Sequence, residues 1–274
     1  MLGAATGARR WPRIAAWTLI GAFLVLLYLP LLPPILFSVG LATPGASAVT
    51  FHAFAELSAN PILVTATITT IEVAVIVGLA APALGLLSAL AVRALGAPRL
   101  VMLLILLPLF IPAISMGLAT SFFFRELGIE PSILTVALVQ TLWALPFATL
   151  VMLTAMSAFD PVLLEAAYVT GANRLRGFLD IELPIIRPGV FGAIVFSLIL
   201  SFNETIRTSL VQGPLNTLQT YIWSTYKQTG LAPSIYALMT LLILLTLLLM
   251  TGIAAIAAGK VNTSPSSAEE ARAG

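Results

Sequence analysis

The sequence predicts an all-α, polytopic membrane protein with six transmembrane helices and one polar elbow between the fourth and fifth helices. Hydrophobic residues make up 59% of the 274 residues and charged residues only 9%, whereas soluble domains carry roughly 25% charged residues. Long uncharged runs recur along the chain, and one long polar interval, 165–189, lies between them. The length fits about six spans of ~20 residues with their loops, and leaves no room for a separate soluble domain.

Each predicted span is an apolar run bounded by charges, prolines or glycines. The six spans are residues 15–37, 64–92, 100–124, 133–155, 188–211 and 236–258. The first run is longer than the ~7–15 apolar residues of a signal peptide, so we expect an uncleaved helix. We therefore predict a membrane domain over residues 1–260 and a disordered tail over 261–274, where the sequence becomes rich in serine and alanine.

Two spans carry features that are unusual inside a membrane. Glu72 lies in the outer third of the second span, where a charge is costly and often functional, although a long side chain can also reach the interface. Pro108 and Pro112 lie inside the third span. We expect them to kink that helix and to free backbone carbonyls.

The polar interval has the pattern of two short helices joined by a turn. Asp160 and Pro161 form a start signal for a helix over about 161–170, and Gly171 suits a left-handed residue after its last turn. Asn173 can cap a second helix, which Pro184 should end. We call residues 156–188 the elbow and expect it to dock into a groove on another protein.

The fifth span ends in polar residues. Thirteen apolar residues after Gly189 are too few to cross a bilayer, so we expect the helix to continue to about residue 211 with Asn203, Glu204 and Arg207 in its outer part. Arg207 lies three residues after Glu204 and can pair with it on a helix. Glu204 therefore remains either a contact for a cation or one half of an internal ion pair.

The distribution of basic residues predicts the orientation. Of the 13 lysine and arginine residues, only Arg125, Arg207 and Lys227 fall in predicted outer segments. Because basic residues concentrate on the cytoplasmic side, both termini and the elbow should be cytoplasmic. This argument is independent of any motif in the elbow.

The elbow contains a spaced motif that resembles the coupling loop of ABC importer permeases, the binding-protein-dependent family. It reads EAA, three residues, G, nine residues, I, one residue, LP. The motif residues are Glu165, Ala166, Ala167, Gly171, Ile181, Leu183 and Pro184. Seven positions at fixed offsets in a polar loop make the resemblance specific. A loop that merely lies on the bilayer surface is the alternative.

The resemblance implies the partners and the location. It implies cytoplasmic ABC ATPase subunits, a second permease subunit in a hetero- or homodimer, an extracytoplasmic solute-binding protein, and a bacterial inner membrane. In that family the elbow sits in a cleft of the ATPase, and closure of two ATPases moves the spans. By carry-over, Glu165 would make polar contact near the ATPase, Gly171 would form the turn, and Leu183 with Pro184 would fix the elbow to the fifth span.

A looser resemblance over most of the chain is to the spermidine/putrescine-type branch of these permeases. It rests on Pro108, Pro112, Ile114, Ser201, Phe202, Glu204, Thr208, Gly213, Pro214, Thr217, Leu218 and Ile222. Ala113 and Asn203 stand where that branch often has acids, which weakens the prediction of a polycation as solute. Polyamine is therefore the leading solute, with phosphonate, thiamine or ferric iron as alternatives. Asn203, Glu204 and Glu72 are the candidate residues of the solute path.

Other functions are less well supported by the residues. The chain has no cysteine and one histidine, His52, so we expect no catalytic centre, metal site or other cofactor. The string from Gly252 to Lys260 has the wrong spacing for a P-loop and is followed by Val261, so ATP should be hydrolysed by a separate subunit. The small net charge of +2 gives no reason to expect nucleic-acid binding. An ion-driven carrier using Glu72 and Glu204 stays possible, but would not need the elbow.

Overall fold

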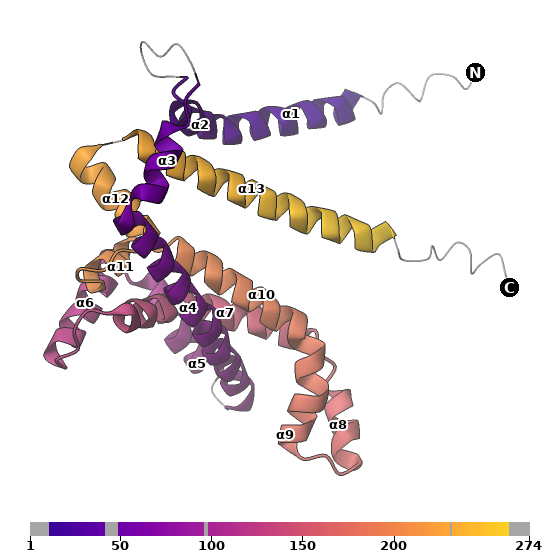
Figure 1. Ribbon diagram of the computed structural model, residues 1–274. Helices are drawn as coiled ribbons and strands as arrows, with labels where there is room; N and C mark the ends of the chain where they lie inside the picture. Colours follow the sequence, from indigo (N-terminus) through magenta and orange to yellow (C-terminus); the bar gives the residue numbers. More distant parts are fainter. Residues whose placement is uncertain (1–10, 42–48, 96–97, 231, 263–274) are drawn as a thin grey trace, which may run out of the picture. The chain divides into compact units, whose positions relative to one another are not determined.

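The computed structural model describes residues 11–41, 49–95, 98–230 and 232–262. Within these ranges the chain forms helices and turns and no β-strand, which confirms the predicted all-α class (Figure 1). The helices belong to two compact units, residues 1–60 with 229–274 and residues 61–228.

The first unit contains the beginning and the end of the chain. Its elements are α1 (Trp11–Tyr28), η1 (Leu29–Leu31), α2 (Leu32–Ser38), α3 (His52–Ala59) and α13 (Pro233–Asn262). The segment Ala15–Ser38 is apolar and long enough to cross a membrane, as predicted for the first span. The α13 helix packs against α2 and α3, and the rings of Phe37 and Tyr236 stack with centroids 4.9 Å apart. The residues that follow Asn262, which include most of the predicted tail, lie outside the described residues, as do Arg9 and Arg10.

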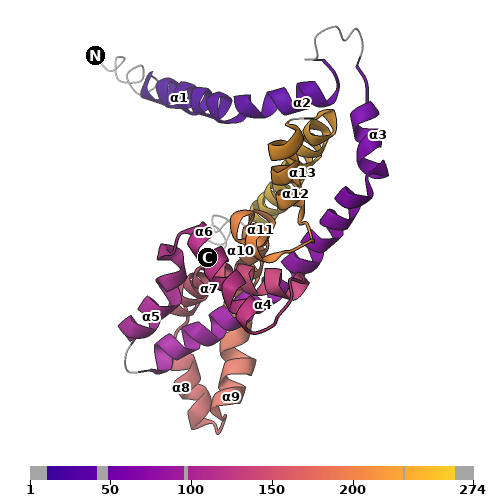
Figure 2. The ribbon, with the colours of Figure 1, turned by 90° about the vertical axis from the view of Figure 1, so that its left-hand side faces the viewer.

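The second unit contains the elbow and the core of the molecule. Its elements are α4 (Pro61–Ala94), α5 (Pro98–Leu106), η2 (Leu107–Phe110), α6 (Ala113–Glu126), α7 (Ile133–Ser157), α8 (Val162–Val169), α9 (Arg174–Arg176), the π-helical η3 (Gly177–Glu182), α10 (Leu183–Phe202), α11 (Ile206–Val211) and α12 (Leu218–Thr229). The most extensive contacts join α4, α7 and α10. The elbow projects from one end of this three-helix core in both views (Figures 1 and 2).

Small residues bring the three core helices close together. A Cβ placed on Gly85 of α4 would lie 2.9 Å from Ala148 of α7, and one placed on Gly189 of α10 would lie 2.2 Å from the Cβ of Ala155. Both distances are shorter than real carbon contacts. Close approach at small residues is how helices pack where lipid gives no hydrophobic driving force.

The third predicted span is broken. The helices Pro98–Phe110 and Ala113–Glu126 meet at an angle of 101°. The two prolines predicted to kink the helix lie at the break, since Pro108 is inside the short 3₁₀ turn and Pro112 precedes α6. Their position was predicted correctly. The expected single kinked helix over 100–124 is wrong, because Pro108 and Pro112 each remove one helical hydrogen-bond donor, in two consecutive turns.

The predicted boundary between the elbow and the fifth span is also wrong. Pro184 does not end the second elbow helix, because the segment Arg174–Phe202 is one apolar helical stretch that passes through Pro184 and Pro188. The π-helical turn Gly177–Glu182 ends two residues before Pro184. A proline lacks an N–H group and clashes with the carbonyl four residues before it, and a widened turn at that position accommodates both effects.

The far end of the fifth span breaks earlier than predicted. Helix α10 ends at Phe202 and α11 begins at Ile206, so the continuous helix expected to residue 211 is interrupted at 203–205. Gly213 then adopts a positive φ of 60°. The break lies at the polar residues that the sequence placed inside the helix, where side chains compete with the backbone for hydrogen bonds.

The described residues contain four helices that are long and apolar enough to cross a membrane, or five if the bent pair is one span. These include Pro61–Ala94 and Ile133–Ser157, which agree with the second and fourth predicted spans. Residues Pro233–Leu248 form a shorter apolar helix within α13. The count of six spans therefore stays a prediction.

Candidate functional site

The elbow is a helical hairpin whose turns are capped as the sequence predicted. The carboxylate of Asp160 accepts a hydrogen bond from the backbone N–H of Val162 at 3.0 Å, at the start of α8. The side chain of Asn173 accepts one from the N–H of Arg176 at 2.8 Å. Gly171 has a φ of +92°, the left-handed region that a glycine adopts without a steric cost. The turn geometry is therefore determined by three identifiable residues.

The two arms of the hairpin contact each other closely. A Cβ on Gly177 would lie 3.0 Å from the ring of Tyr168 and 3.2 Å from the side chain of Leu164. Ala167, one of the motif residues, is buried. Packing between the arms makes the elbow a compact body rather than an extended loop.

The motif residues divide into two groups. Ile181 and Leu183 are partly buried against the hydrophobic core formed by the long helices, and so join the elbow to that core. Glu165, Ala166, Gly171 and Pro184 are exposed. The structure therefore places Ile181, Leu183 and the exposed Pro184 at the base of the elbow, and Glu165, Ala166 and Gly171 on the surface of its first arm and turn.

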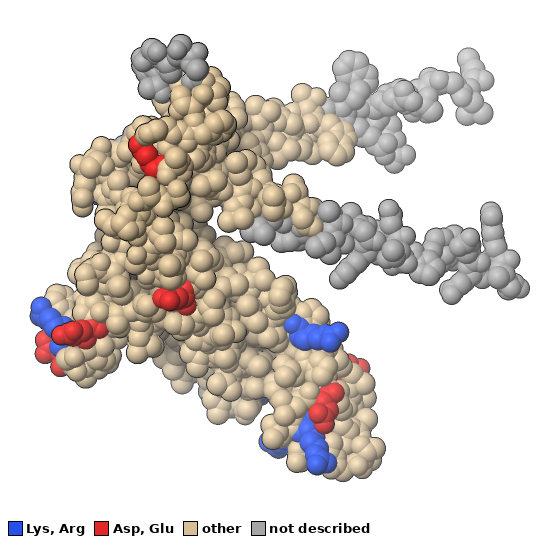
Figure 3. All heavy atoms as spheres, in the orientation of Figure 1, with Lys and Arg blue, Asp and Glu red and all other residues tan. Residues whose placement is uncertain are grey.

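The tip of the elbow exposes apolar side chains among charged ones. Val169 and Leu175 are 88% and 65% exposed, on either side of the turn at Gly171. Charged side chains gather around the α8–α9 hairpin and again near α6, with a mainly uncharged surface between them (Figure 3). Apolar side chains inside a charged region, away from the uncharged belt, are typical of a surface that binds another protein.

An ion pair that the sequence did not predict lies at the base of the elbow. The guanidinium of Arg93, in the last turn of α4, donates to both carboxylate oxygens of Glu182 at 2.5 and 3.0 Å. Glu182 is completely buried, whereas the side chain of Arg93 is 48% exposed. The two residues are 89 positions apart in the sequence. Charge counting treated Arg93 only as a cytoplasmic anchor, and no local signal linked it to Glu182.

A second ion pair lies at the break between α10 and α11. The Glu204 carboxylate accepts hydrogen bonds from the Arg207 side chain at 2.7 Å and from the Arg207 backbone N–H at 3.0 Å. Both side chains are 7% exposed. The Arg207 guanidinium also lies 3.9 Å from the centre of the Trp143 ring and 3.3 Å from the sulfur of Met116. The sequence left Glu204 as either a contact for a cation or one half of an internal ion pair, and the structure shows the ion pair.

Neutral polar side chains join the same break to α7. Gln140 donates to the hydroxyl of Thr208 at 2.8 Å and accepts from the hydroxyl of Ser201 at 2.5 Å. The hydroxyl of Thr135 donates to the backbone carbonyl of Val211 at 3.1 Å. Buried polar groups at membrane depth need such partners, and these bonds satisfy groups near the interrupted helix.

The other two candidate residues of the solute path are exposed. The amide of Asn203 donates to the carbonyl of Ile199, one turn earlier, at 2.8 Å. Glu72 lies on the exposed face of α4, between the exposed Ile71 and the buried Val73. The structure thus brings Asn203 and Glu204 to the same helix break, and leaves Glu72 on the surface of another helix.

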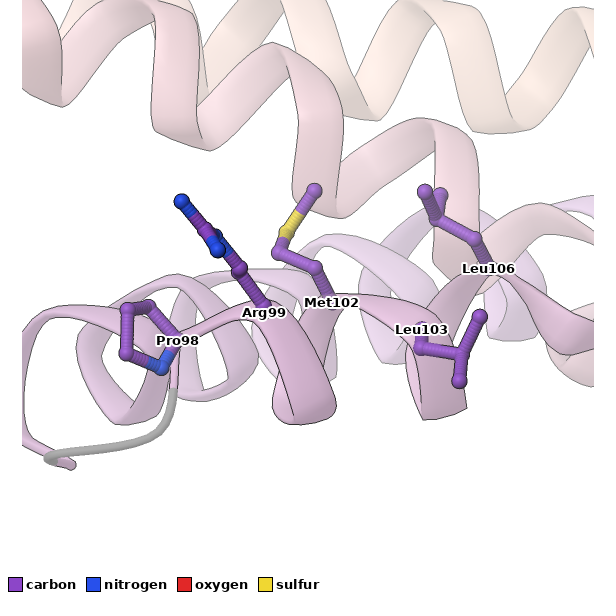
Figure 4. Close-up of a pocket in the computed structure, with 5 residues that line it drawn as sticks. All are labelled: Pro98, Arg99, Met102, Leu103 and Leu106. Atoms are coloured by element: carbon purple, nitrogen blue, oxygen red, sulfur yellow. The ribbon is translucent and has the colours of Figure 1, made fainter.

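A hollow of about 410 Å³ lies over one face of α5. Its lining residues, Pro98, Arg99, Met102, Leu103 and Leu106, all belong to this one helix, and the Arg99 and Met102 side chains point to the same side (Figure 4). A hollow lined by one helix face is part of the outer surface of the unit. None of the candidate solute-path residues lines it.

Comparison with known protein families identifies the chain. The model of the family described as "Binding-protein-dependent transport system inner membrane component" matches residues 82–262. The chain belongs to this family. The matched region includes the whole elbow, the α10–α11 break and α13, so the resemblance that the elbow motif indicated is confirmed.

Several curated relatives of this family member are named as spermidine/putrescine or putrescine permeases. The spermidine/putrescine transport system permease protein PotC of Escherichia coli strain K12 is 31% identical over 150 residues, which cover 54% of this chain and 56% of PotC. The putrescine transport system permease protein PotI of the same strain is 28% identical over 143 residues, which cover 50% of each chain. The chain thus spans about half the length of the curated relatives it matches.

Solved structures confirm the fold of this family member. A chain of a bacterial ABC transporter involved in the import of the acidic polysaccharide alginate has a TM-score of 0.71 at 15% identity, and the match covers 92% of this chain and 98% of that chain. A chain of the alginate transporter in complex with an alginate pentasaccharide-bound periplasmic protein has a TM-score of 0.68 at 20% identity, covering 94% and 97%.

Proposed function

We propose that this chain is a membrane-spanning permease subunit of an ATP-driven ABC importer, which forms part of a solute path and couples it to a separate ATPase. The observation that carries the proposal is the elbow. It is a compact hairpin with an exposed apolar tip, and its base packs against the core of three long helices. A rigid body that joins a docking surface to membrane helices can transmit a displacement between them.

The motif residues have distinct roles in this proposal. The ATPase-binding surface includes Glu165, Ala166 and the turn at Gly171, all of which are exposed. Ala167 packs inside the hairpin, and Ile181, Leu183 and Pro184 join it to α10. A force on the tip of the elbow would therefore reach α10, the helix that ends at the break beside Asn203.

The proposal includes partners and an orientation. The chain would assemble with cytoplasmic ABC ATPase subunits, a second permease subunit and an extracytoplasmic solute-binding protein in a bacterial inner membrane, with both termini cytoplasmic and a membrane domain over residues 1–260. A structural neighbour is an ABC transporter in complex with a periplasmic protein, which supports this assembly. The chain would carry no nucleotide site of its own, because the elbow's function is to receive motion from an ATPase.

We propose a polyamine as the solute, since PotC is named as a spermidine/putrescine permease and PotI as a putrescine permease. Within this chain, Glu72 is the candidate contact for an ammonium group. An exposed carboxylate on an apolar helix is costly in lipid, so we expect its face of α4 to line the solute path or the contact with the second permease subunit.

One observation favours a different solute. Glu204 is neutralised by Arg207, and Asn203 is uncharged, so the helix break presents no net negative charge to a polycation. Among the alternative solutes phosphonate, thiamine and ferric iron, the phosphonate is the anion, and it is therefore the second candidate. The two candidates separate in an ATP-dependent uptake assay with the complete complex and radiolabelled spermidine, using unlabelled candidate solutes as competitors.

The docking proposal is tested with a charge at the elbow tip. We expect Val169→Asp to reduce recovery of the ATPase with the affinity-purified permease at least about tenfold, because a charge would replace an apolar side chain that the docked ATPase covers. Leu127→Asp is a matched control, because Leu127 is also an exposed aliphatic residue, 58% exposed, but lies after α6 outside the elbow. Equal ATPase recovery with both variants would contradict docking at the tip.

A further inference from the structure

We infer that Arg93 and Glu182 form a strut that fixes the elbow to α4, so that α4 and α10 move together when the elbow is displaced. The inference rests on the proposed coupling function and adds a positioning pair to it. Neither residue belongs to the elbow motif. The pair joins the end of α4 to the last residue of the π-helical turn, directly beside Leu183.

The geometry of the pair fixes an angle as well as a distance. A guanidinium that donates to both oxygens of one carboxylate holds the two planar groups in a defined orientation. Among the described residues, no other ion pair joins the elbow to a helix outside it. Elsewhere the elbow meets the core through apolar packing, which resists separation but permits sliding.

The burial of Glu182 makes the pair hard to separate. Its side chain is completely buried, so removing Arg93 would leave a carboxylate without its charged partner in a site that water cannot reach. Arg93 is half exposed and keeps part of its guanidinium in a polar environment. The pair is therefore expected to stay closed through a transport cycle and to act as a joint between rigid parts.

The strut extends the reach of the elbow to a second helix. The elbow continues directly into α10, and Arg93 adds a connection to α4, which carries Glu72 about 32 Å away along the helix axis. Gly78 and Gly85 bring the intervening part of α4 close to α10 and α7. A displacement at Glu182 would thus move both α4, which carries the exposed Glu72, and α10, which ends beside the exposed Asn203.

The main test is the number of solute molecules imported per ATP hydrolysed by the complete complex in proteoliposomes. We expect Arg93→Gln and Glu182→Gln each to lower this ratio about three- to tenfold. The double variant should resemble the single variants, because the pair acts as one unit. Arg99→Gln is the matched control, because it removes an exposed arginine from the adjacent α5 and should keep the wild-type ratio.

The possible outcomes separate a strut from a purely stabilising pair. If uptake and ATP hydrolysis fall in proportion to the amount of assembled complex, with the ratio unchanged, the strut is refuted. If the single variants do not assemble, Arg93→Leu with Glu182→Leu replaces the pair by apolar groups. We expect that variant to assemble and remain uncoupled, and a wild-type ratio in it would refute the strut. A wild-type complex without ATP-dependent uptake would instead refute the proposed function.

A distance measurement on the chain alone gives an independent test. The chain has no cysteine, so spin labels can be attached only at introduced positions. Leu87→Cys on α4 and Val169→Cys at the elbow tip are both exposed. We expect Arg93→Gln to broaden the distance distribution between these labels at least about twofold, because the angular restraint is lost. An unchanged width would contradict the inference.

Discussion

At the scale of single residues, Gly171 shows most clearly how one backbone angle determines the elbow. Its φ of +92° turns the chain between α8 and α9, and no atom from outside residues 170–172 lies within 4 Å of the position a Cβ would take. A side chain there would be disfavoured by the backbone conformation and not by crowding. A left-handed residue other than glycine costs about 1–2 kcal/mol.

We expect Gly171→Val to abolish most ATP-driven uptake while leaving the amount of chain in the membrane unchanged, because the strain distorts the docking surface and not the membrane helices. Gly128→Val is a matched control, because Gly128 also has a positive φ, +69°, with open space around it, but lies beyond α6. Uptake assays and membrane immunoblots measure both effects. Normal uptake with Gly171→Val would contradict the role given to the turn.

Glu72 is the residue that tests the polyamine proposal. We expect Glu72→Gln to raise the KM for spermidine several-fold with little change in membrane level, because an exposed carboxylate is lost from α4 without creating a cavity. Glu130→Gln, in an exposed loop, should have wild-type uptake. A KM unaffected by Glu72→Gln would remove Glu72 from the solute path.

Glu204 differs from Glu72 because its charge is already paired. We expect Glu204→Gln to lower the melting temperature of the purified chain, since Arg207 would remain buried without its carboxylate, and breaking such a pair costs about 3–5 kcal/mol. Combining it with Arg207→Met should restore part of the loss. A melting temperature unchanged by Glu204→Gln would show that the pair contributes little to the fold.

At the scale of elements, local sequence signals predicted some features and missed others for physical reasons. The caps at Asp160 and Asn173 and the turn at Gly171 depend on neighbouring residues, so the sequence predicted them correctly. Pro184 was misinterpreted because a proline normally ends a helix, and the widened turn before it could not be inferred locally. The Arg93–Glu182 pair joins residues 89 positions apart, and only the folded chain brings them together.

The close contact between α7 and α10 gives a prediction about an element. We expect Gly189→Val to lower the melting temperature of the purified chain by several degrees, because an added Cβ would lie 2.2 Å from Ala155 and would separate the two helices. Gly192→Val on the same helix is the control, with its nearest atom at 3.9 Å. Equal melting temperatures for both variants would contradict the close packing.

At the scale of the whole molecule, the proposed function makes this chain a transducer of motion from an ATPase and not an autonomous carrier. In the proposed function the exposed tip of the elbow is the docking surface, its base packs against the three-helix core, and the break beside Asn203 holds polar groups between α10 and α11. The all-α class and the family followed from composition and one spaced motif. The broken third span and the interrupted fifth helix did not, because hydropathy reports apolar length and not the path of the backbone.

The most direct test of the central claim is solute uptake by proteoliposomes that contain the purified chain with and without its ATPase, second permease subunit, binding protein and ATP. The account predicts uptake only when all the partners and hydrolysable ATP are present. Accumulation of solute by vesicles that contain this chain alone, driven by an ion gradient in the absence of nucleotide, would contradict it.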